Sequence, residues 1–130
     1  MIDAIAWIHI HQQKLLCVRT QGKDAFYLPG GKREPGESDE QTLMREVAEE
    51  LNIHLQPKTI TWFNTYEADA HGYQVGTQVR MPCYQAAFDG TFQPSAEIAE
   101  MAWFGSGERD RCAPVNRIVI DDLVRQGLII

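Results

Sequence analysis

The chain has few cysteines, a deficit of basic residues and no long hydrophobic run. Its three cysteines, Cys17, Cys83 and Cys112, are widely spaced and form no CxxC pair, which favours buried thiols in a reducing compartment over a disulfide framework. No stretch approaches the roughly 20 apolar residues of a membrane span, so we expect no contact with a membrane. The first residues, MIDAIAWIHIHQQK, lack the basic start and apolar core of a signal peptide. We therefore expect a cytoplasmic protein.

The deficit of basic residues limits the ligands that the protein can bind. There are 12 lysines and arginines against 18 acidic residues, which gives a net charge of −6. This balance argues against the large positive surface on which duplex DNA or RNA binding depends, so we expect no nucleic acid polymer as a partner. A small phosphate-bearing ligand is compatible with it, because a divalent metal can supply the missing positive charge.

The 130 residues are enough for one domain, spanning 1–130, with its own core. Ser38, with Gln41 three residues later, forms a capping-box pattern that predicts a helix from there to about Leu51, and Asn52 is a plausible left-handed stop. A second helix is predicted at 113–127. The apolar pattern predicts strands at 2–10, 14–20, 26–29, 59–69, 78–88 and 100–105, the first two as a hairpin. Several strands with two helices indicate an α+β layered sandwich around a mixed sheet.

The first of these helices carries an unusual concentration of acids. On a helical wheel Glu49 lies about 60° to one side of Glu46 and Glu50 about 40° to the other, so the three carboxylates share one face. Like charges at this spacing repel each other. The apolar face beside them is suited to packing on a sheet. It is made of Leu43, Met44, Val47, Ala48 and Leu51.

The loop before the helix adds to this concentration. Glu34 and Glu37 lie in this loop. Together with the three glutamates of the acidic face they make five between residues 34 and 50, and Glu40 is a sixth that belongs to neither group. Two adjacent glycines, Gly30 and Gly31, allow the backbone to approach a ligand closely. Such a density of hard oxygen donors suits Mg²⁺ or Mn²⁺. Without the loop, the acids could equally form a solvated surface.

The segment GGKREPGESDEQTLMREVAEELNI, residues 30–53, resembles the Nudix box, whose pattern is G, five residues, E, seven residues, then R-E-apolar-x-E-E-x-G-apolar. Gly31, Glu37 and the run from Arg45 to Ile53 match eight of its nine defined positions. Asn52 stands where the pattern has glycine. Because asparagine tolerates the left-handed conformation, we expect a small cost in stability and little effect on the chemistry.

The resemblance implies a Nudix-type α/β/α sandwich with a central mixed β-sheet, and a hydrolase that cleaves a nucleoside diphosphate linked to a further group, X. It implies Mg²⁺, or Mn²⁺, held by Glu46, Glu49 and Glu50, with the Gly31 carbonyl and Glu34 as further candidates. Glu50 matches the position most often essential for catalysis, and Glu49 is a second catalytic candidate. Arg45 matches a residue that pairs with Glu37 and orients the loop against the helix.

Outside the box the resemblance is to MutT-type members. Lys32 follows the two glycines as in those proteins, and APVNRIVI, residues 113–120, resembles the segment through which MutT contacts its purine. Asn116 is therefore a candidate base reader, although it could instead simply begin the last helix. Arg19 could reach a phosphate or lie free on the surface. Tyr66, His71 and Tyr73 are candidates for the border of the cleft without any support from their spacing.

The general base and the group X stay open at this stage. In some Nudix enzymes a loop glutamate before the late strand is the base, which points to Glu97 in preference to Glu100; in others a box glutamate does this work. Sequence markers of the ADP-ribose, NADH and coenzyme A hydrolases are missing. By elimination we expect a nucleoside triphosphate, with oxidised purine triphosphates among the candidates, to be cleaved to the monophosphate and pyrophosphate. Nucleotide sugars, ADP-ribose-like compounds and a non-catalytic nucleotide-binding module are the alternatives. The protein could be a monomer or a homodimer.

Overall fold

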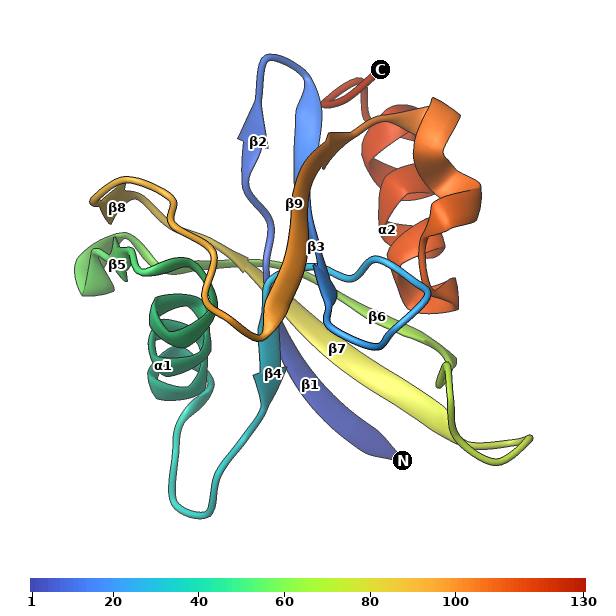
Figure 1. Cartoon of the computed structure of the whole chain (residues 1–130), viewed down its shortest axis with the longest axis horizontal. Coiled ribbons are helices and arrows are strands. Elements are labelled where there is room, and N and C mark those ends of the chain that lie inside the picture. The colour runs from blue at the N-terminus through green and yellow to red at the C-terminus, as the bar shows by residue number, and fades with distance from the viewer.

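The computed structural model describes all residues, 1–130, with two larger β-sheets, a short two-stranded one, and one helix on each side of the larger sheets (Figure 1). The larger sheet has the strand order β4 (Gly30–Lys32), β1 (Ile2–Trp7), β7 (Gln78–Gln85) and β6 (Thr61–Asp69). Only β1 and β7 run parallel, and the other pairs are antiparallel, so this sheet is mixed, as predicted. The smaller sheet is antiparallel and joins β2 (Ile10–His11), β3 (Lys14–Thr20) and β9 (Ile98–Phe104).

The strand predicted at 2–10 serves both sheets and is not one arm of a simple hairpin. Ile8 donates its backbone N–H to Tyr84 in β7, while the carbonyl of His9 accepts from Leu16 in β3. The chain thus passes from the larger sheet to the smaller one between these two residues. The apolar run that predicted one strand reflects burial on both faces, which a pattern of apolar residues alone does not divide.

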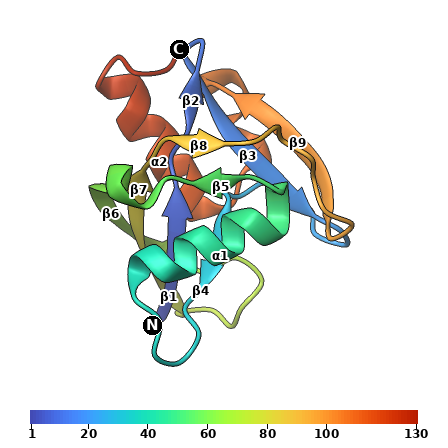
Figure 2. The ribbon, with the colours of Figure 1, turned by 90° about the vertical axis from the view of Figure 1, so that its left-hand side faces the viewer.

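Helix α1 (Asp39–Leu51) and helix α2 (Pro114–Arg125) cover opposite faces of the sheets (Figures 1 and 2). The α1 side buries Leu43, Val47 and Leu51 against Ile5 and Trp7. The α2 side buries a larger cluster that includes Val115, Val119, Ile120, Leu123, Ala6 and Met81. The α+β sandwich with a central mixed sheet is therefore confirmed. Neither helix has the length and apolar run needed to cross a bilayer.

The segment around Pro29 departs from the prediction. Residues 26–29, expected to form a strand, make only single bridges, from Tyr27 to Val18 and from Phe26 to Cys112. The strand β4 instead forms at Gly30–Lys32, in the segment that the sequence analysis assigned to the loop before the helix. Gly30 permits this because the Ile5 carbonyl oxygen lies only 2.0 Å from the position that a Cβ would occupy. Close pairing of β4 with β1 therefore depends on a residue without a side chain.

Several short elements complete the fold and were not predicted. Strands β5 (His54–Leu55) and β8 (Phe88–Asp89) pair with each other beside the end of α1, and short 3-10 helices form at Pro57–Thr59 and Ser106–Arg111. The backbone N–H groups of Gln93 and Ser95 donate to the last carbonyls of α1, those of Leu51 and Glu50. This loop before β9 is thereby held at the C-terminal end of the acidic helix.

Candidate active site

Helix α1 begins and ends as the sequence predicts. The Gln41 N–H donates to the Ser38 hydroxyl at 3.2 Å and the Ser38 N–H donates to the Gln41 side chain at 2.9 Å, which is the capping box. At the other end Asn52 adopts the left-handed conformation, with φ 57° and ψ 35°, and its N–H donates to the Ala48 carbonyl. Asparagine thus makes the turn that glycine makes in the Nudix pattern.

The loop before α1 is fixed to the helix by Arg45. Its Nε and Nη2 donate to the two carboxylate oxygens of Glu37 at 2.7 and 2.9 Å, a bidentate pair. The same guanidinium donates to Glu46 at 2.8 Å and to the Lys32 carbonyl at 3.2 Å. Glu37 also accepts from the Glu34 N–H and the Thr42 hydroxyl. Arg45 and these donors hold the pKa of Glu37 well below its usual range, at about 2.

The two glycines bring the backbone of β4 against the acids. The Gly30 N–H donates to Glu50 Oε1 at 3.0 Å. A Cβ on Gly31 would lie 2.4 Å from the carboxyl carbon of Glu46. The strand backbone can therefore lie in contact with the carboxylates only because both residues lack a side chain.

The acids are held in an environment that disfavours their charge. Burial raises the pKa of Glu50 to about 8; the Gly30 N–H opposes this, and the charges of Glu46, Glu49 and Glu97 add to it. Burial also raises the pKa of Glu46, although Arg45 counteracts the shift. A cation placed among these groups would favour their ionised forms.

The donor set fits a hard divalent metal, because Glu46, Glu49 and Glu50 supply carboxylate oxygens and Gly31 places no side chain against Glu46. As the side chains lie, no three acidic, histidine or cysteine groups converge closely enough to hold an ion. Arg45 accounts for this: it donates to Glu46, and its Nη1 lies 3.5 Å from Glu49 and 3.7 Å from Glu34. These carboxylates would have to turn away from Arg45 to meet around a metal.

A cleft beside β4 is lined at one end by Glu50. It consists of two adjoining cavities of about 150 and 260 Å³, which share Ala4, Thr20, Tyr27, Gly31, Met81 and Val115. The smaller cavity reaches Gly30 and Glu50, and the larger one reaches Lys32, His71 and Tyr73. The walls are mostly apolar with a few polar groups at the mouth, which is typical of a site for a small organic ligand.

The two candidate loop acids differ in their surroundings. Glu100 accepts from Arg19 at 2.8 and 3.0 Å, and Arg19 also donates to the Lys23 carbonyl. Arg19 is thus bound to an acid and does not line the cleft, where Thr20 does. Glu97 is exposed, has no ion-pair partner, and lies close enough to Glu50 for its charge to raise the pKa of that carboxyl.

Lys32 and Asn116, two candidates for substrate binding, differ in their access to the cleft. The Lys32 ammonium lines the larger cavity and donates to the Tyr73 hydroxyl at 2.6 Å. Asn116 is fully buried next to the cleft; its amide nitrogen lies 3.6 Å from Cys17 Sγ and its Oδ1 has no partner. The cleft wall at this point is formed by its neighbour Val115. A contact from Asn116 to a base would require its side chain to turn away from Cys17.

Most of the cleft was not predicted from the sequence. Tyr27, Met81 and Val115 come from three separate segments and share no motif. His71 and Tyr73 do border the cleft, whereas Tyr66 is buried and donates to Asp122 at 2.6 Å, away from it.

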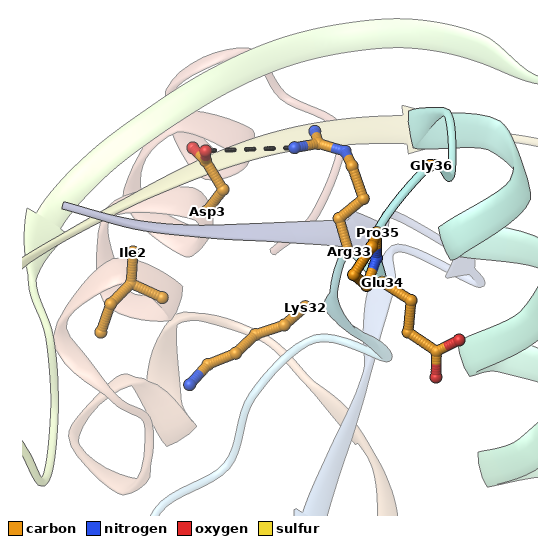
Figure 3. A pocket seen from close by; sticks show the side chains of 7 residues that line it. All are labelled: Ile2, Asp3, Lys32, Arg33, Glu34, Pro35 and Gly36. Carbon is orange, nitrogen blue, oxygen red and sulfur yellow. Dashed lines mark ion pairs between the residues drawn. The ribbon is translucent and has the colours of Figure 1, made fainter.

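A second hollow, of about 470 Å³, lies outside this cleft against residues 32–36 (Figure 3). Arg33 faces Asp3 there, with 4.0 Å between Nη1 and Oδ2, and Glu34 points toward α1. Lys32 points the opposite way, toward the side of Ile2. This open hollow is lined by Ile2 and Asp3 of β1 and by residues 32–36, and it shares only Lys32 and Glu34 with the candidate site.

Comparison with known proteins decides the family. The chain matches the NUDIX domain over residues 2–122. It belongs to the Nudix family. The Nudix box of α1 and its loop is therefore the family's motif, and the chain is a Nudix hydrolase, of a family that acts on small nucleotide substrates and generally uses divalent metals.

Individual proteins resemble the chain to different extents. The solution structure of the Escherichia coli ORF135 protein matches with a TM-score of 0.74 and 25% identity, over 96% of this chain and 89% of that one. The MutT NUDIX hydrolase of Burkholderia pseudomallei matches with a TM-score of 0.73 and 22% identity, over 92% and 95%. The human 8-oxo-dGDP phosphatase NUDT18 is 45% identical over 38 residues, which are 29% of this chain and only 12% of that protein.

Proposed function

We propose that this Nudix hydrolase is a Mg²⁺-dependent pyrophosphohydrolase, with Mn²⁺ as a substitute metal, that cleaves nucleoside triphosphates to monophosphates and pyrophosphate. The observation that carries the proposal is the position of Glu50: a half-buried carboxyl that accepts from the Gly30 N–H at 3.0 Å, lines an apolar cleft and has its pKa raised to about 8. The name of the human relative, an 8-oxo-dGDP phosphatase, makes oxidised purine nucleotides the first substrates to test.

The acids have distinct roles in this proposal. Glu46, Glu49 and Glu50 hold the metal, with the Gly31 carbonyl and Glu34 as further donors. When bound, the metal neutralises the phosphate oxygens and lowers the pKa of water. Arg45 does not touch the substrate; through Glu37 and the Lys32 carbonyl it keeps β4 and the loop in place against the helix.

The cleft supplies the binding site for the nucleoside. Its apolar floor, formed by Ala4, Met81 and Val115, offers a surface for the base, and Lys32 lines the larger of the two cavities. A nucleotide with its base on this floor would carry its phosphate chain across Gly31, the residue common to the cleft and the acidic site. The net charge of −6 is consistent with a small nucleotide that binds together with a metal, and not with a nucleic acid polymer.

Glu97 is our candidate for the general base. It is exposed, free of an ion pair and close to Glu50, whereas Glu100 is engaged by Arg19. Its loop is fixed by the bond from the Ser95 N–H to the Glu50 carbonyl, 2.8 Å, and by the bond from the Gln21 N–H to the carbonyl of Glu97 itself, 2.8 Å. A carboxylate held there could accept a proton from the attacking water.

The proposal is tested with a panel of nucleoside triphosphates, oxidised purines included, together with nucleotide sugars and ADP-ribose. Release of pyrophosphate or phosphate is measured with Mg²⁺ for the natural chain, Glu50→Gln and Glu40→Gln, the last being an exposed acid of the same helix. We expect Glu50→Gln to lose at least a hundredfold in rate and Glu40→Gln to match the natural chain. Turnover of sugars or ADP-ribose alone would reassign the substrate, and equal rates for both variants would refute the site.

A further inference from the structure

The loop between β6 and β7, residues 70–77, closes one side of the cleft. Its backbone makes two bonds of its own, from Ala70 N–H to Thr77 and from Thr77 N–H to Gln74, at 2.8 and 3.0 Å. Gly72 and Gly76 have φ of +81° and +92°, with nothing within 4 Å of the position of a Cβ. The tip of the loop is exposed, and the apolar side chain of Val75 is fully open to solvent. Few packing contacts therefore restrain this loop, and such segments open at low cost.

Two side chains of the loop reach the opposite wall of the cleft. The Tyr73 hydroxyl accepts from the Lys32 ammonium at 2.6 Å, and the same ammonium lies 5.1 Å from the centre of the Tyr73 ring. His71 Nε2 lies 2.9 Å from Asp24 Oδ1, and its ring is 6.3 Å from that of Tyr27. Both contacts cross the mouth of the larger cavity, so the loop is tied to β4 and to the segment before it.

The contact between Lys32 and Tyr73 is the one that a bound substrate would affect. Successive residues of a strand face opposite sides, and in β4 the side-chain position of Gly31 faces Glu46 while Lys32 lines the cleft. Figure 3 shows Lys32 pointing away from Glu34 and α1. A phosphate chain that runs from the cleft across Gly31 would pass this ammonium. An ammonium bonds more strongly to an anionic phosphate oxygen than to a neutral phenol.

We propose that Tyr73 is a positioning residue that holds Lys32 in the empty enzyme and releases it to the phosphates of a bound nucleotide. The inference rests on the proposed function, because it takes a nucleoside di- or triphosphate as the ligand. Since the bond to Tyr73 must break before Lys32 binds phosphate, it opposes binding and makes affinity depend on the presence of a phosphate chain.

The decisive variant is Tyr73→Phe, which removes the hydroxyl and keeps the ring. Tyr73 is half exposed, so the substitution leaves the core intact. Releasing one hydrogen bond should lower KM for a nucleoside triphosphate about three- to tenfold, with a smaller change in kcat. In a Lys32→Met background the same substitution should leave KM unchanged, because the partner is gone. Val75→Ala, on the same loop, is the matched control and should behave as the natural chain does.

Direct binding separates this inference from the proposed function. Titration calorimetry with a non-hydrolysable α,β-methylene nucleoside triphosphate should show the same three- to tenfold gain in affinity for Tyr73→Phe. If the analogue binds more tightly but no triphosphate is hydrolysed, the Lys32–Tyr73 contact acts as inferred and the proposed reaction is wrong. If triphosphates are hydrolysed but Tyr73→Phe alters neither KM nor affinity, or alters them equally with Lys32→Met present, the inference is overturned.

Discussion

Arg45 and Glu37 form the main connection between the loop and the helix of the Nudix box, through two bonds of 2.7 and 2.9 Å. Lysine cannot make both bonds, because its ammonium is a point donor and lacks the planar fork of a guanidinium. We predict that Arg45→Lys lowers kcat/KM about ten- to hundredfold, as substitutions of residues that orient metal ligands typically do. Initial rates and a metal titration measure this loss.

Arg33→Lys provides the control for that substitution. Arg33 lies in the same loop and pairs with Asp39, but it contacts none of the acids assigned to the metal. Its replacement should leave kcat/KM within about twofold, since an exposed ion pair contributes little. Equal losses for both variants would show that the loop is merely sensitive to any change.

The adjacent glycines should respond differently to alanine. In Gly31→Ala the new Cβ meets the end of the flexible Glu46 side chain, at 2.4 Å, which can move at the expense of the site. We predict that this variant folds with little loss of stability and loses most of its activity. In Gly30→Ala the Cβ meets the Ile5 carbonyl oxygen at 2.0 Å, on backbone that cannot move aside, and φ is +146°. This variant should be poorly folded.

Gly22→Ala separates backbone strain from these clashes. Gly22 has φ +80° with nothing within 4 Å of its Cβ position, so alanine should cost only about 1–2 kcal/mol in the free energy of unfolding. Chemical denaturation and activity assays on the three variants provide the comparison. Full activity in Gly31→Ala would refute the close approach of β4 to Glu46.

Asn116 should act on stability more than on the choice of base. Its side chain is fully buried beside Cys17, so Asn116→Ala leaves a cavity and should lower the free energy of unfolding by about 1–3 kcal/mol. We expect its effects on KM for purine and pyrimidine triphosphates to be alike. A rise in KM confined to purines would instead support the role as base reader that the resemblance to MutT implies.

The sequence predicts those parts of the site that are formed by residues close together along the chain. The capping box at Ser38, the left-handed Asn52 and the acidic face of α1 all follow from spacing within one helix. The cleft could not be predicted in this way, because Tyr27, Met81 and Val115 meet only through the pairing of strands and the packing of α2 against the sheets.

Packing across the sheets explains the other differences. The apolar run at 2–10 does not show that its two ends join different sheets, since both are buried alike. Trp62 is 57% exposed on β6, an edge strand of its sheet, although an indole buries a large apolar area when it lies in a core. Its position on an edge strand depends on the strand order, which the type of residue does not indicate.

Glu50 leads to a prediction about pH. Its pKa is about 8 in the folded protein, against 4.5 for an ordinary glutamate. Below about pH 4.5 the carboxyl is protonated in the folded and the unfolded chain, so its ionisation does not lower the free energy of unfolding. As pH rises from there to about 8, the unfolded chain ionises while the folded chain resists, so stability is lost progressively across this window. Glutamine cannot ionise, and Glu50→Gln should therefore be more stable than the natural chain, by a margin that grows from pH 5 to pH 8.

Thermal unfolding in EDTA measures this margin, with Glu40→Gln as the control, since that acid is exposed. Each 1 kcal/mol corresponds to roughly 3–6 °C in Tm for a domain of this size. Added Mn²⁺ should reverse the order, because an ionised Glu50 can bind the cation and a glutamine amide binds it more weakly; metal bound only to the folded state raises Tm. A margin that is the same at pH 5 and pH 8 would mean that Glu50 is not held protonated. If Mn²⁺ leaves the Tm values unchanged, no metal at this site favours the ionised form of Glu50.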